Sequence, residues 1–488
     1  MRPSSPEATA ARTLSFLLVG LMIILIVVLA AVISGGMGIR VVILLMGVMA
    51  AGICFFNTEM ALYLILFAML FSPEFSLGGT LAEDRSLVIR AEDILIFIVF
   101  SSWLLKTAIY KGIGLIVKTP LNQGIRLYIF AAFISTLLGA IRGDLHLASG
   151  LLYVFKYIEF FLVFFIFTNN ITERDQVVRF LIAAMIVAVF TGLYAAIQIP
   201  FGVRVSAPFE GEAGEPNTLG GYLILIISVC GALWNHLKDP TVRRILVAII
   251  AFLLIPFLYT MSRSSWVAAV PMFVVFYILT DKRFLLTTLL ILFTVMAPFI
   301  LPDAVKKRIT QTFTPETGFE HTVTIGETGL DPSTSVRIGS FKYSINKWKQ
   351  HPLMGWGITG VGIIDSTYFR LLAEMGLAGV AAFGFMLYVI FRYLYRTYHE
   401  SEDPLIRGLS LGLIAATAAL LGHSVGAASF IIVRIMEPYW FFMAALFVLN
   451  QNEQSQQAVR VPSTSPESEE IPQFQKTAPD LRAGRYTR

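Results

Sequence analysis

The sequence predicts an all-α fold: a polytopic transmembrane bundle of about 12–14 membrane-spanning helices with one long loop. Of its 488 residues, 56% are hydrophobic and only 14% are charged, and the mean hydropathy is +0.74. Soluble domains carry roughly 25% charged residues, so this composition excludes one. The apolar residues also gather in runs near the length that crosses a bilayer, roughly 17–25 residues.

Reading the apolar runs in chain order gives about fourteen candidate spans. They lie near residues 14–34, 41–56, 60–72, 92–106, 125–141, 150–168, 177–199, 217–236, 245–261, 264–280, 284–301, 375–394, 405–422 and 435–449. Two pairs are joined by very short polar links, at 57–59 and at 262–264. Counts of about twelve or thirteen therefore stay open.

Basic residues in four connections predict the orientation of the spans, because cytoplasmic loops are enriched in lysine and arginine. They are Lys106, Lys111 and Lys118; Lys238, Arg243 and Arg244; Lys282 and Arg283; and Arg392, Arg396 and Arg407. A cytoplasmic N-terminus places all four connections in the cytoplasm. The same parity places Arg204, Arg263 and the long loop on the outer side, and both termini inside.

The chain divides into four regions by composition. These are a transmembrane bundle at 1–301, a large outer loop at 302–374, C-terminal transmembrane helices at 375–449, and a cytoplasmic tail at 450–488. The tail is rich in Ser, Pro, Gln and Glu, which is typical of disorder. Within the loop, residues 333–350 predict an amphipathic helix that Pro352 ends, and Ser366 or Thr367 can cap the next helix.

The composition excludes several kinds of site. The two cysteines, Cys54 and Cys230, both lie in apolar runs and are interpreted as small buried hydrophobes. The sequence contains no P-loop and no clustered His/Cys ligands, so we expect neither a metal nor a cofactor. The net charge of +5 arises from the loops that flank the spans, and therefore does not indicate nucleic-acid binding.

Four motifs follow one another in the second half of the chain. They are "RVSAPFEGEAGEPNTLGGYL" at 204–223, "MSRSSWVAA" at 261–269, "HPLMGWG" at 351–357 and "YFRLLAEMGLAG" at 368–379. Arg337 lies on the predicted helix before the third motif. In this order they resemble the signature of the O-antigen ligase and Wzy-type O-antigen polymerase superfamily. The resemblance covers roughly residues 200–395 and elsewhere extends only to general hydropathy.

The resemblance implies a glycosyltransferase of the bacterial inner membrane whose active site faces the periplasm. Such enzymes use a glycan on undecaprenyl diphosphate as donor and need no metal, because the donor is already activated. The acceptor is a second lipid-linked glycan in a polymerase, and lipid A-core or another acceptor in a ligase. Membrane lipids, a chain-length regulator and a flippase of the same pathway are the further partners implied, and nucleic acid is not.

Six residues could carry this chemistry. Arginines are needed to bind the leaving diphosphate and to stabilise its growing charge, which indicates Arg204, Arg263 and Arg337. The attacking hydroxyl needs a base, and Asp365 stands where ligases of this family typically carry a histidine. This difference favours a polymerase. We predict Asp365, Arg337 and Arg263 to be catalytic, and the substrate-binding residues to be Arg204, Glu374 and Arg434.

Structural interpretations of the same residues stay open. Arginines at the ends of spans can anchor to lipid head groups. Asp365 can cap a helix. Glu374 can pair with Arg370 at i,i+4 spacing, and Arg434 with Glu437 at i,i+3. His351 and His423 are interpreted as structural.

The leading interpretation is polymerisation of lipid-linked repeat units of a surface polysaccharide, such as O-antigen or an exopolysaccharide. Ligation to another acceptor is the alternative within the family. A polysaccharide-related transporter or flippase is the alternative from another class, and it predicts inverted repeats and ionisable residues near mid-membrane. The chain shows no convincing inverted halves. Lys156 and Glu159, three apart on one span, are interpreted as an ion pair.

Overall fold

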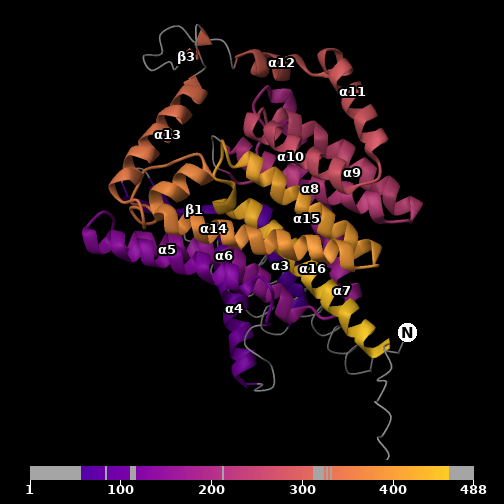
Figure 1. The fold of residues 1–488 in the computed structure, drawn as a ribbon, viewed down its shortest axis with the longest axis horizontal. Helices are drawn as coiled ribbons and strands as arrows, with labels where there is room; N and C mark the ends of the chain where they lie inside the picture. The colour runs from indigo at the N-terminus through magenta and orange to yellow at the C-terminus, as the bar shows by residue number, and fades with distance from the viewer. Residues whose placement is uncertain are drawn as a thin grey trace, which may run out of the picture.

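The computed structural model describes residues 57–82, 85–109, 117–210, 214–311, 324–325, 328–329 and 332–460. The two spans expected near 14–34 and 41–56 lie outside these residues. The described chain is a bundle of helices joined by short connections, together with two small antiparallel hairpins (Figure 1). The all-α class is therefore confirmed, and the hairpins are an addition that the sequence did not predict.

A helix covers each predicted span from residue 60 onward. In chain order these helices are α3 (Thr58–Phe71), α4 (Ala91–Ile109), α5 (Asn122–Arg142), α6 (Leu147–Asn170), α7 (Arg174–Gln198), α8 (Pro216–His236), α9 (Pro240–Tyr259), α10 (Arg263–Leu279), α11 (Arg283–Ile300), α14 (Thr367–Glu400), α15 (Pro404–His423) and α16 (Val433–Arg460). The 3₁₀ turns η1 (Ile199–Phe201) and η3 (Ser429–Ile431) extend two of the connections.

The first hairpin, β1 (Glu74–Ala82) with β2 (Arg85–Arg90), joins α3 to α4. The second, β3 (Thr324–Ile325) with β4 (Thr328–Gly329), lies within the long loop.

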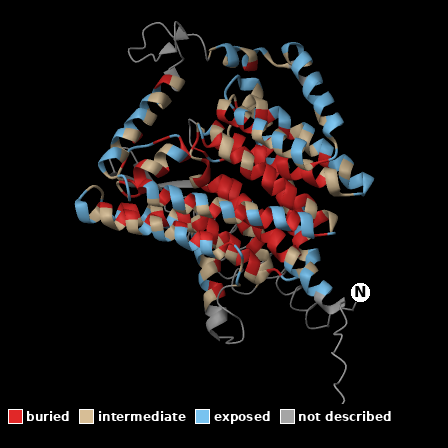
Figure 2. Cartoon of the chain, in the orientation of Figure 1, coloured by how far each residue is buried: buried red, intermediate tan, exposed pale blue. Residues whose placement is uncertain are grey.

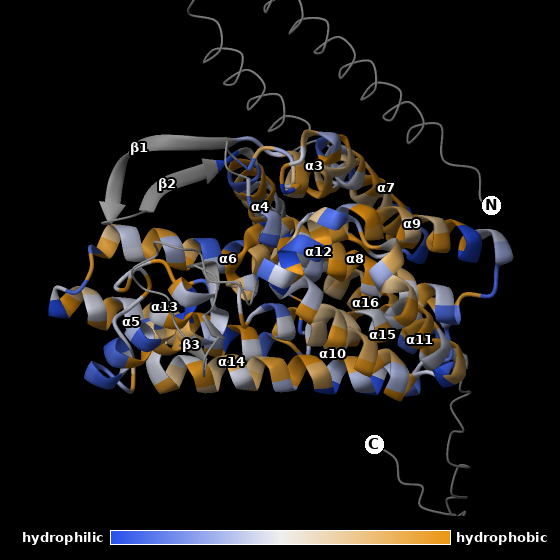
Figure 3. Ribbon diagram, turned by 90° about the horizontal axis from the view of Figure 1, so that it is seen from above, coloured by the Kyte–Doolittle hydropathy of each residue, from blue (hydrophilic) through white to orange (hydrophobic). Residues whose placement is uncertain are grey.

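Seven of the described helices are long and apolar enough to cross a membrane, namely α5, α6, α7 with η1, α8, α9, α14 and α15. α3 and α10 are apolar but shorter. Most residues along these helices are hydrophobic (Figure 3), and many large apolar side chains on them are exposed. The protein is therefore a multi-pass membrane protein.

The core of the bundle is built on α8 and α15 (Figure 2). Small residues let these two helices approach closely: a Cβ at Gly412 would lie 2.9 Å from the Cα of Val229. Close approach through small residues is the usual basis of helix packing in membranes, where lipid is as apolar as leucine. Among the candidate spans of the described chain, α8 is the most buried.

Polar contacts between connections show which of them lie at the same end of the bundle. At one end Arg174 forms an ion pair with Asp403, and Asn452 donates to the carbonyl of Thr172 at 2.9 Å. This end carries the connections expected in the cytoplasm. The connections expected on the outer side meet at the other end, which holds the candidate site.

The long loop forms an arch beside the bundle (Figure 1). After α11 the chain bends by 96° into α12 (Asp303–Thr310), passes through β3–β4, and returns along α13 (Pro332–Gln350) to α14. The predicted amphipathic helix at 333–350 is thus found as α13. Val336, expected on its apolar face, is 57% exposed, whereas Phe341 stacks on Phe369 of α14 at 4.1 Å between ring centroids.

α16 continues to Arg460, so the predicted disordered tail at 450–488 begins as helix. The remainder of that tail, 461–488, lies outside the described residues.

Candidate active site

α14 is broken near its start. Gly376 adopts φ +62° and ψ −160°, which interrupts the hydrogen bonding of the helix on both sides. The "HPLMGWG" segment at 351–357 replaces the lost partners with four backbone bonds. These run from Trp356 N–H to Ala373 O (3.0 Å), Gly357 N–H to Glu374 O (2.8 Å), Leu377 N–H to Pro352 O (2.9 Å) and Ala378 N–H to Leu353 O (3.0 Å). Two of the sequence motifs therefore form one structural unit.

The glycines of this unit are required by its geometry. Gly355 has φ +65°, and a Cβ there would lie 2.5 Å from the carbonyl carbon of Glu374. A Cβ at Gly376 would lie 2.5 Å from the carbonyl oxygen of Leu353. The unit is also tied to α5, because Arg142 Nη2 donates to the Gly355 carbonyl at 2.5 Å.

Glu374 is buried inside this unit. Its carboxylate accepts from Arg370 Nε (3.2 Å), from the Tyr157 hydroxyl (3.3 Å) and from the backbone N–H of Thr359 (3.3 Å). These contacts join α14 to α6 and to the loop. The geometry thus favours the structural interpretation of Glu374 over the predicted substrate-binding role, because the carboxylate points inward.

Arg204 lies against the turn between α9 and α10. Its Nε donates to the carbonyl of Thr260 at 3.1 Å, and its Nη2 to the carbonyl of Met261 at 3.4 Å. Ser262 then caps α10, and Arg263 is the first residue of that helix. Two of the predicted diphosphate-binding arginines, 59 residues apart in sequence (263 − 204), are thus neighbours in the fold.

Four arginines from four elements gather here. Partial burial, followed by the positive charges of Arg308, Arg337 and Arg263, lowers the pKa of Arg204 to about 10. Each of these three guanidinium groups therefore adds positive charge to the surroundings of Arg204. The structure places Arg204, Arg263 and Arg337 around one turn and one wall, and their role as diphosphate ligands stays a prediction. Arg308, on α12, was not predicted.

The connection between α15 and η3 forms one wall of the cluster. A Cβ built on Gly426 would overlap the hydroxyl of Ser264 and would lie 3.8 Å from Cζ of Arg337. Only a glycine lets this wall approach both groups so closely.

Asp365 lies next to the same wall. The following residue, Ser366, donates its hydroxyl to the carbonyl of Ser424 at 3.1 Å, and the N–H of Thr367 donates to that carbonyl at 3.1 Å. Asp365 itself is exposed. Ser366, not Asp365, is the N-cap of α14, and within the described part of the chain the Asp365 carboxylate accepts no capping bond. The helix-cap alternative for Asp365 thus lacks its hydrogen bond.

A buried hydroxyl–imidazole network fixes the start of α10. His423 is inaccessible, with Nε2 3.1 Å from the Ser265 hydroxyl and Nδ1 2.7 Å from the Ser429 hydroxyl. The Ser265 hydroxyl donates to the Ser262 hydroxyl at 2.7 Å, and the Ser262 hydroxyl donates to Oδ1 of Asn217 of α8 at 2.8 Å. The network agrees with a structural role for His423. It connects residues far apart in sequence, so no local pattern could have revealed it.

Arg434 is fully buried and holds two connections together. Its guanidinium donates to four carbonyls, those of Leu70 (3.4 Å), Ser72 (3.0 Å), Phe209 (3.1 Å) and Pro208. The predicted substrate-binding role does not fit this position, since these internal carbonyls occupy the group. Arg434 instead anchors the segment that begins at Arg204.

Lys156 of α6 contacts Glu159 at 3.7 Å, as predicted, and pairs more closely with Asp93 of α4. Asp93 was not part of the predicted pair. The cluster joins α4 to α6.

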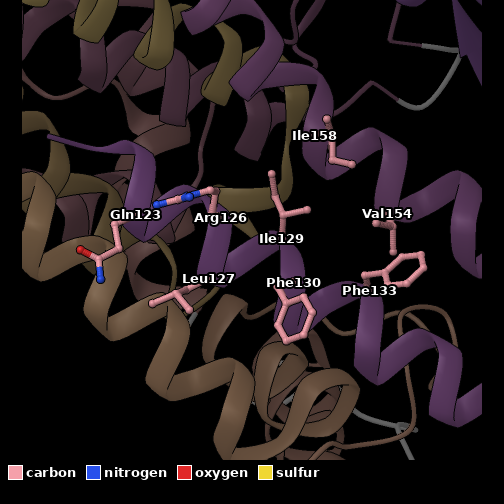
Figure 4. Close-up of a pocket in the computed structure, with 8 residues that line it drawn as sticks. All are labelled: Gln123, Arg126, Leu127, Ile129, Phe130, Phe133, Val154 and Ile158. Carbon is pink, nitrogen blue, oxygen red and sulfur yellow. The ribbon is translucent and has the colours of Figure 1, made fainter. Parts of the chain in front are cut away.

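A groove of about 630 Å³ lies on the face of α5 and α6 (Figure 4). Leu127, Phe130, Phe133 and Ile158 line it, with Arg126 at one end. None of the clustered arginines reaches it, so this groove is separate from the candidate site.

Residues 246–384 match a family model described as O-antigen ligase. No curated protein matches the chain. The matched segment contains Arg263, Arg308, Arg337, Asp365 and the broken start of α14, whereas Arg204 and Arg434 lie outside it. The resemblance inferred from the sequence motifs is thereby confirmed over residues 246–384, where the chain is similar to the O-antigen ligase family.

Proposed function

We propose that this protein is an inner-membrane glycosyltransferase that polymerises undecaprenyl-diphosphate-linked repeat units of a surface polysaccharide. The family gives the coarser conclusion, an enzyme of the O-antigen ligase and polymerase type. The observation that carries the proposal is that Arg204 contacts the turn before Arg263, and that Ser264 and Arg337 meet the same wall at Gly426. A cluster of guanidinium groups at a membrane surface suits the diphosphate of a lipid-linked donor.

The arginine cluster would act on the leaving group. A hydroxyl of the acceptor attacks the anomeric carbon of the donor glycan and forms the new glycosidic bond. The bond from that carbon to the diphosphate breaks, and the diphosphate oxygen leaves with the electron pair. Guanidinium groups already in place stabilise this growing charge without reorganisation, which is the usual source of the largest catalytic effect.

Asp365 would accept the proton of the attacking hydroxyl. It is exposed, and its neighbours Ser366 and Thr367 are bonded to the wall that also contacts Arg337. A base must lie within hydrogen-bonding reach of the proton it removes. Glu374, Arg434 and His423 act in this scheme as positioning residues.

We further propose that the arginine end of the bundle faces the periplasm. The opposite end carries the basic connections around Arg243, Lys282 and Arg407, and the positive-inside rule assigns such connections to the cytoplasm. Both termini would then be cytoplasmic. The donor, the acceptor glycolipid, a chain-length regulator and a flippase of the same pathway are the partners this placement suits.

Ligation is the second candidate function, because the matching family model is described as O-antigen ligase. Asp365 favours the polymerase, since ligases of this family typically carry a histidine there. The lipid-linked intermediates of a deletion strain distinguish the two functions. Single repeat units on the carrier lipid or on lipid A-core indicate a polymerase, and full-length polymer retained on undecaprenyl diphosphate indicates a ligase.

A further inference from the structure

One stripe of α5 and one turn of α6 line the groove of about 630 Å³ on the side of the bundle (Figure 4). Most of its residues on α5 recur every three or four positions and therefore share one face of that helix. They are Gln123, Arg126, Leu127, Phe130 and Phe133, and Val154 and Ile158 of α6 lie beside them. Pockets that bind small molecules usually enclose about 300–1,000 Å³. The groove is therefore large enough to hold part of a ligand.

The groove is apolar along most of its length. Val154 is 3% exposed, as expected at the base of a groove, whereas Phe130 is 63% exposed. Because α5 and α6 are both candidate membrane spans, the opening faces lipid tails. Lipid tails are as apolar as these side chains, so burial of an acyl chain alone would not select one lipid over another. Selection has to come from the polar end of the groove.

The polar end carries a guanidinium group. Among the described residues that line the groove, only Gln123 and Arg126 are polar, and they lie at the same end of it (Figure 4). Arg126 is exposed, and within the described part of the chain its side chain forms no hydrogen bond or ion pair. A charged group close to hydrocarbon is costly unless it reaches a polar partner or the lipid head groups. Its donors are thus available for a phosphate, which a guanidinium can bind through two parallel bonds.

Contacts at the start of α5 place Arg126 at the end of the bundle opposite to the arginine cluster. Asn122 Nδ2 donates to the carbonyl of Val117 at 3.2 Å, and the N–H of Val117 donates to Oδ1 of Asn169 at 3.2 Å. Asn169 lies in the last turn of α6, next to the connection that meets α16 at this end. Arg126 is one turn further along α5, close to the same end.

The length of the groove fits a lipid chain of one leaflet. Arg126 and Phe133 are two helical turns apart, about 10 Å along α5. One leaflet contributes about 15 Å to the hydrocarbon core, so the groove spans most of one leaflet. The proposed donor would have its diphosphate at the opposite end of the bundle, where it could not meet Arg126. A phospholipid of the nearer leaflet can place its phosphate at Arg126 and an acyl chain along Phe133.

We propose that the groove binds one acyl chain of an anionic phospholipid, and that Arg126, with Gln123, holds the lipid phosphate. The head group is anionic because Arg126 supplies a positive charge that no ion pair within the described chain neutralises, whereas a zwitterionic head group brings a second cation. This site goes beyond the proposed function and does not depend on it.

The lipid would also support the candidate active site, because α5 reaches that site with its other half. The Ser135 hydroxyl of α5 donates to the carbonyl of Glu374 at 2.6 Å. A lipid that holds α5 against α6 therefore also steadies the broken start of α14.

Native mass spectrometry of the full-length protein tests the head group. The probes are phosphatidylglycerol and phosphatidylcholine with the same acyl chains, added to delipidated protein in detergent. We expect the wild type to retain one phosphatidylglycerol at an about 5-fold lower lipid concentration than phosphatidylcholine, the value of one cation beside an anionic lipid. Arg126→Ala should remove this preference. Lys118→Ala, at an exposed position of the same end that does not line the groove, should keep it.

Equal retention of the two lipids by the wild type, or the same loss of preference in both variants, would overturn the proposal.

A second pair of variants tests where the acyl chain lies. Leu127→Trp fills the groove, whereas Leu152→Trp adds the same bulk at a similarly exposed position of α6 that does not line it. A phosphatidylglycerol with a photoreactive acyl chain should label α5 or α6 in the wild type and in Leu152→Trp, and this labelling should be lost in Leu127→Trp.

Three outcomes of the labelling experiment would contradict the proposal. Equal labelling of the two tryptophan variants would show that the chain lies elsewhere. Stronger labelling of α5 and α6 by a photoreactive polyprenyl diphosphate would assign the groove to the donor. A lipid-free dimer that blocks labelling would assign it to a second copy of the chain.

Discussion

The N–H of Gly357 donates to the carbonyl of Glu374 at 2.8 Å, across the break in α14. This bond exists because Gly376 releases the carbonyl from its helical partner. It explains why a very hydrophobic chain keeps a glycine-rich, charged segment where a span begins. The glycines permit the approach, and the Arg370–Glu374 pair holds it from inside the bundle.

Gly376→Ala should disrupt this unit. A Cβ would meet the Leu353 carbonyl at 2.5 Å on a backbone with φ +62°, so the helix or the loop has to move. We expect a loss of at least about 1–3 kcal/mol of stability, the usual cost of a strained conformation. Thermal unfolding of the protein in detergent measures it.

Gly384→Ala is the matched control in the same helix, because a Cβ there meets nothing within 4 Å. It should be neutral or stabilising, by up to about 1 kcal/mol. Equal unfolding temperatures for the two variants would show that the break in α14 tolerates a side chain.

Much of the bundle could be predicted from the sequence, because apolar runs of bilayer length permit little except helices. Each span predicted from residue 60 onward is found as a helix. The break at Gly376 could not be predicted, since the motif that compensates for it lies some twenty residues earlier and acts through backbone bonds. The β1–β2 hairpin was missed because it falls in the connection between two apolar runs.

The candidate site was predicted from the residue types that the expected chemistry needs, and its role stays a prediction. Because a diphosphate needs guanidinium groups to bind it, the sequence analysis selected Arg204, Arg263 and Arg337. The fold brings these three residues together. Sequence reasoning could not separate Arg434 from this group, because burial against four carbonyls leaves no local signal. Arg308 was not predicted, because the sequence "KKR" in α12 is typical of a solvent-exposed basic helix and does not single out one residue.

Arg263→Ala and Arg337→Ala should each abolish polymer formation while leaving protein levels intact. Removing one preorganised donor to a developing charge typically lowers the rate by about 10²–10³-fold. Polymer length on gels and transfer with purified lipid-linked donor measure the effect. Arg396→Ala, on an exposed pair with Glu400 at the far end of α14, is the control and should be active. Normal chains in either arginine variant would remove that residue from the site.

Asp365→Asn should reduce the transfer rate far more than Ser366→Ala. The amide keeps the size of the side chain but cannot take the proton from the acceptor. Ser366→Ala removes only the bond to the Ser424 carbonyl. Initial rates at saturating donor compare the two. Equal, mild losses would exclude Asp365 as the base.

Reporters fused after Lys282 and within residues 310–330 should lie on opposite sides of the membrane. α11 separates the two positions, and Lys282 belongs to the basic connections. An alkaline phosphatase and a fluorescent-protein fusion at each position give complementary signals. The same side for both would overturn the orientation and the periplasmic site together.

Glu210 should make the stability of the protein depend on pH. It lies in the connection between η1 and α8, where one carboxylate oxygen accepts from the N–H groups of Ala207 (3.1 Å) and Glu215 (3.0 Å). Burial, opposed by the charge of Arg434, raises the pKa of Glu210 from 4.5 to about 8. Between these values the folded state holds a proton that the unfolded state has lost. Stability should therefore fall as the pH rises from about 4.5 to 8, and level off above that.

Glu210→Gln removes this dependence, because the amide stays neutral and keeps an oxygen for the two N–H groups. At pH 8.5 we expect its unfolding temperature in detergent to exceed that of the wild type by several degrees, with the difference disappearing toward pH 5. Glu400→Gln, at an exposed position, should follow the wild type at both pH values. If the gain in unfolding temperature of Glu210→Gln were largest at pH 5, the sign of this linkage would be reversed. The folded state would then favour the ionised form of Glu210 over the protonated form.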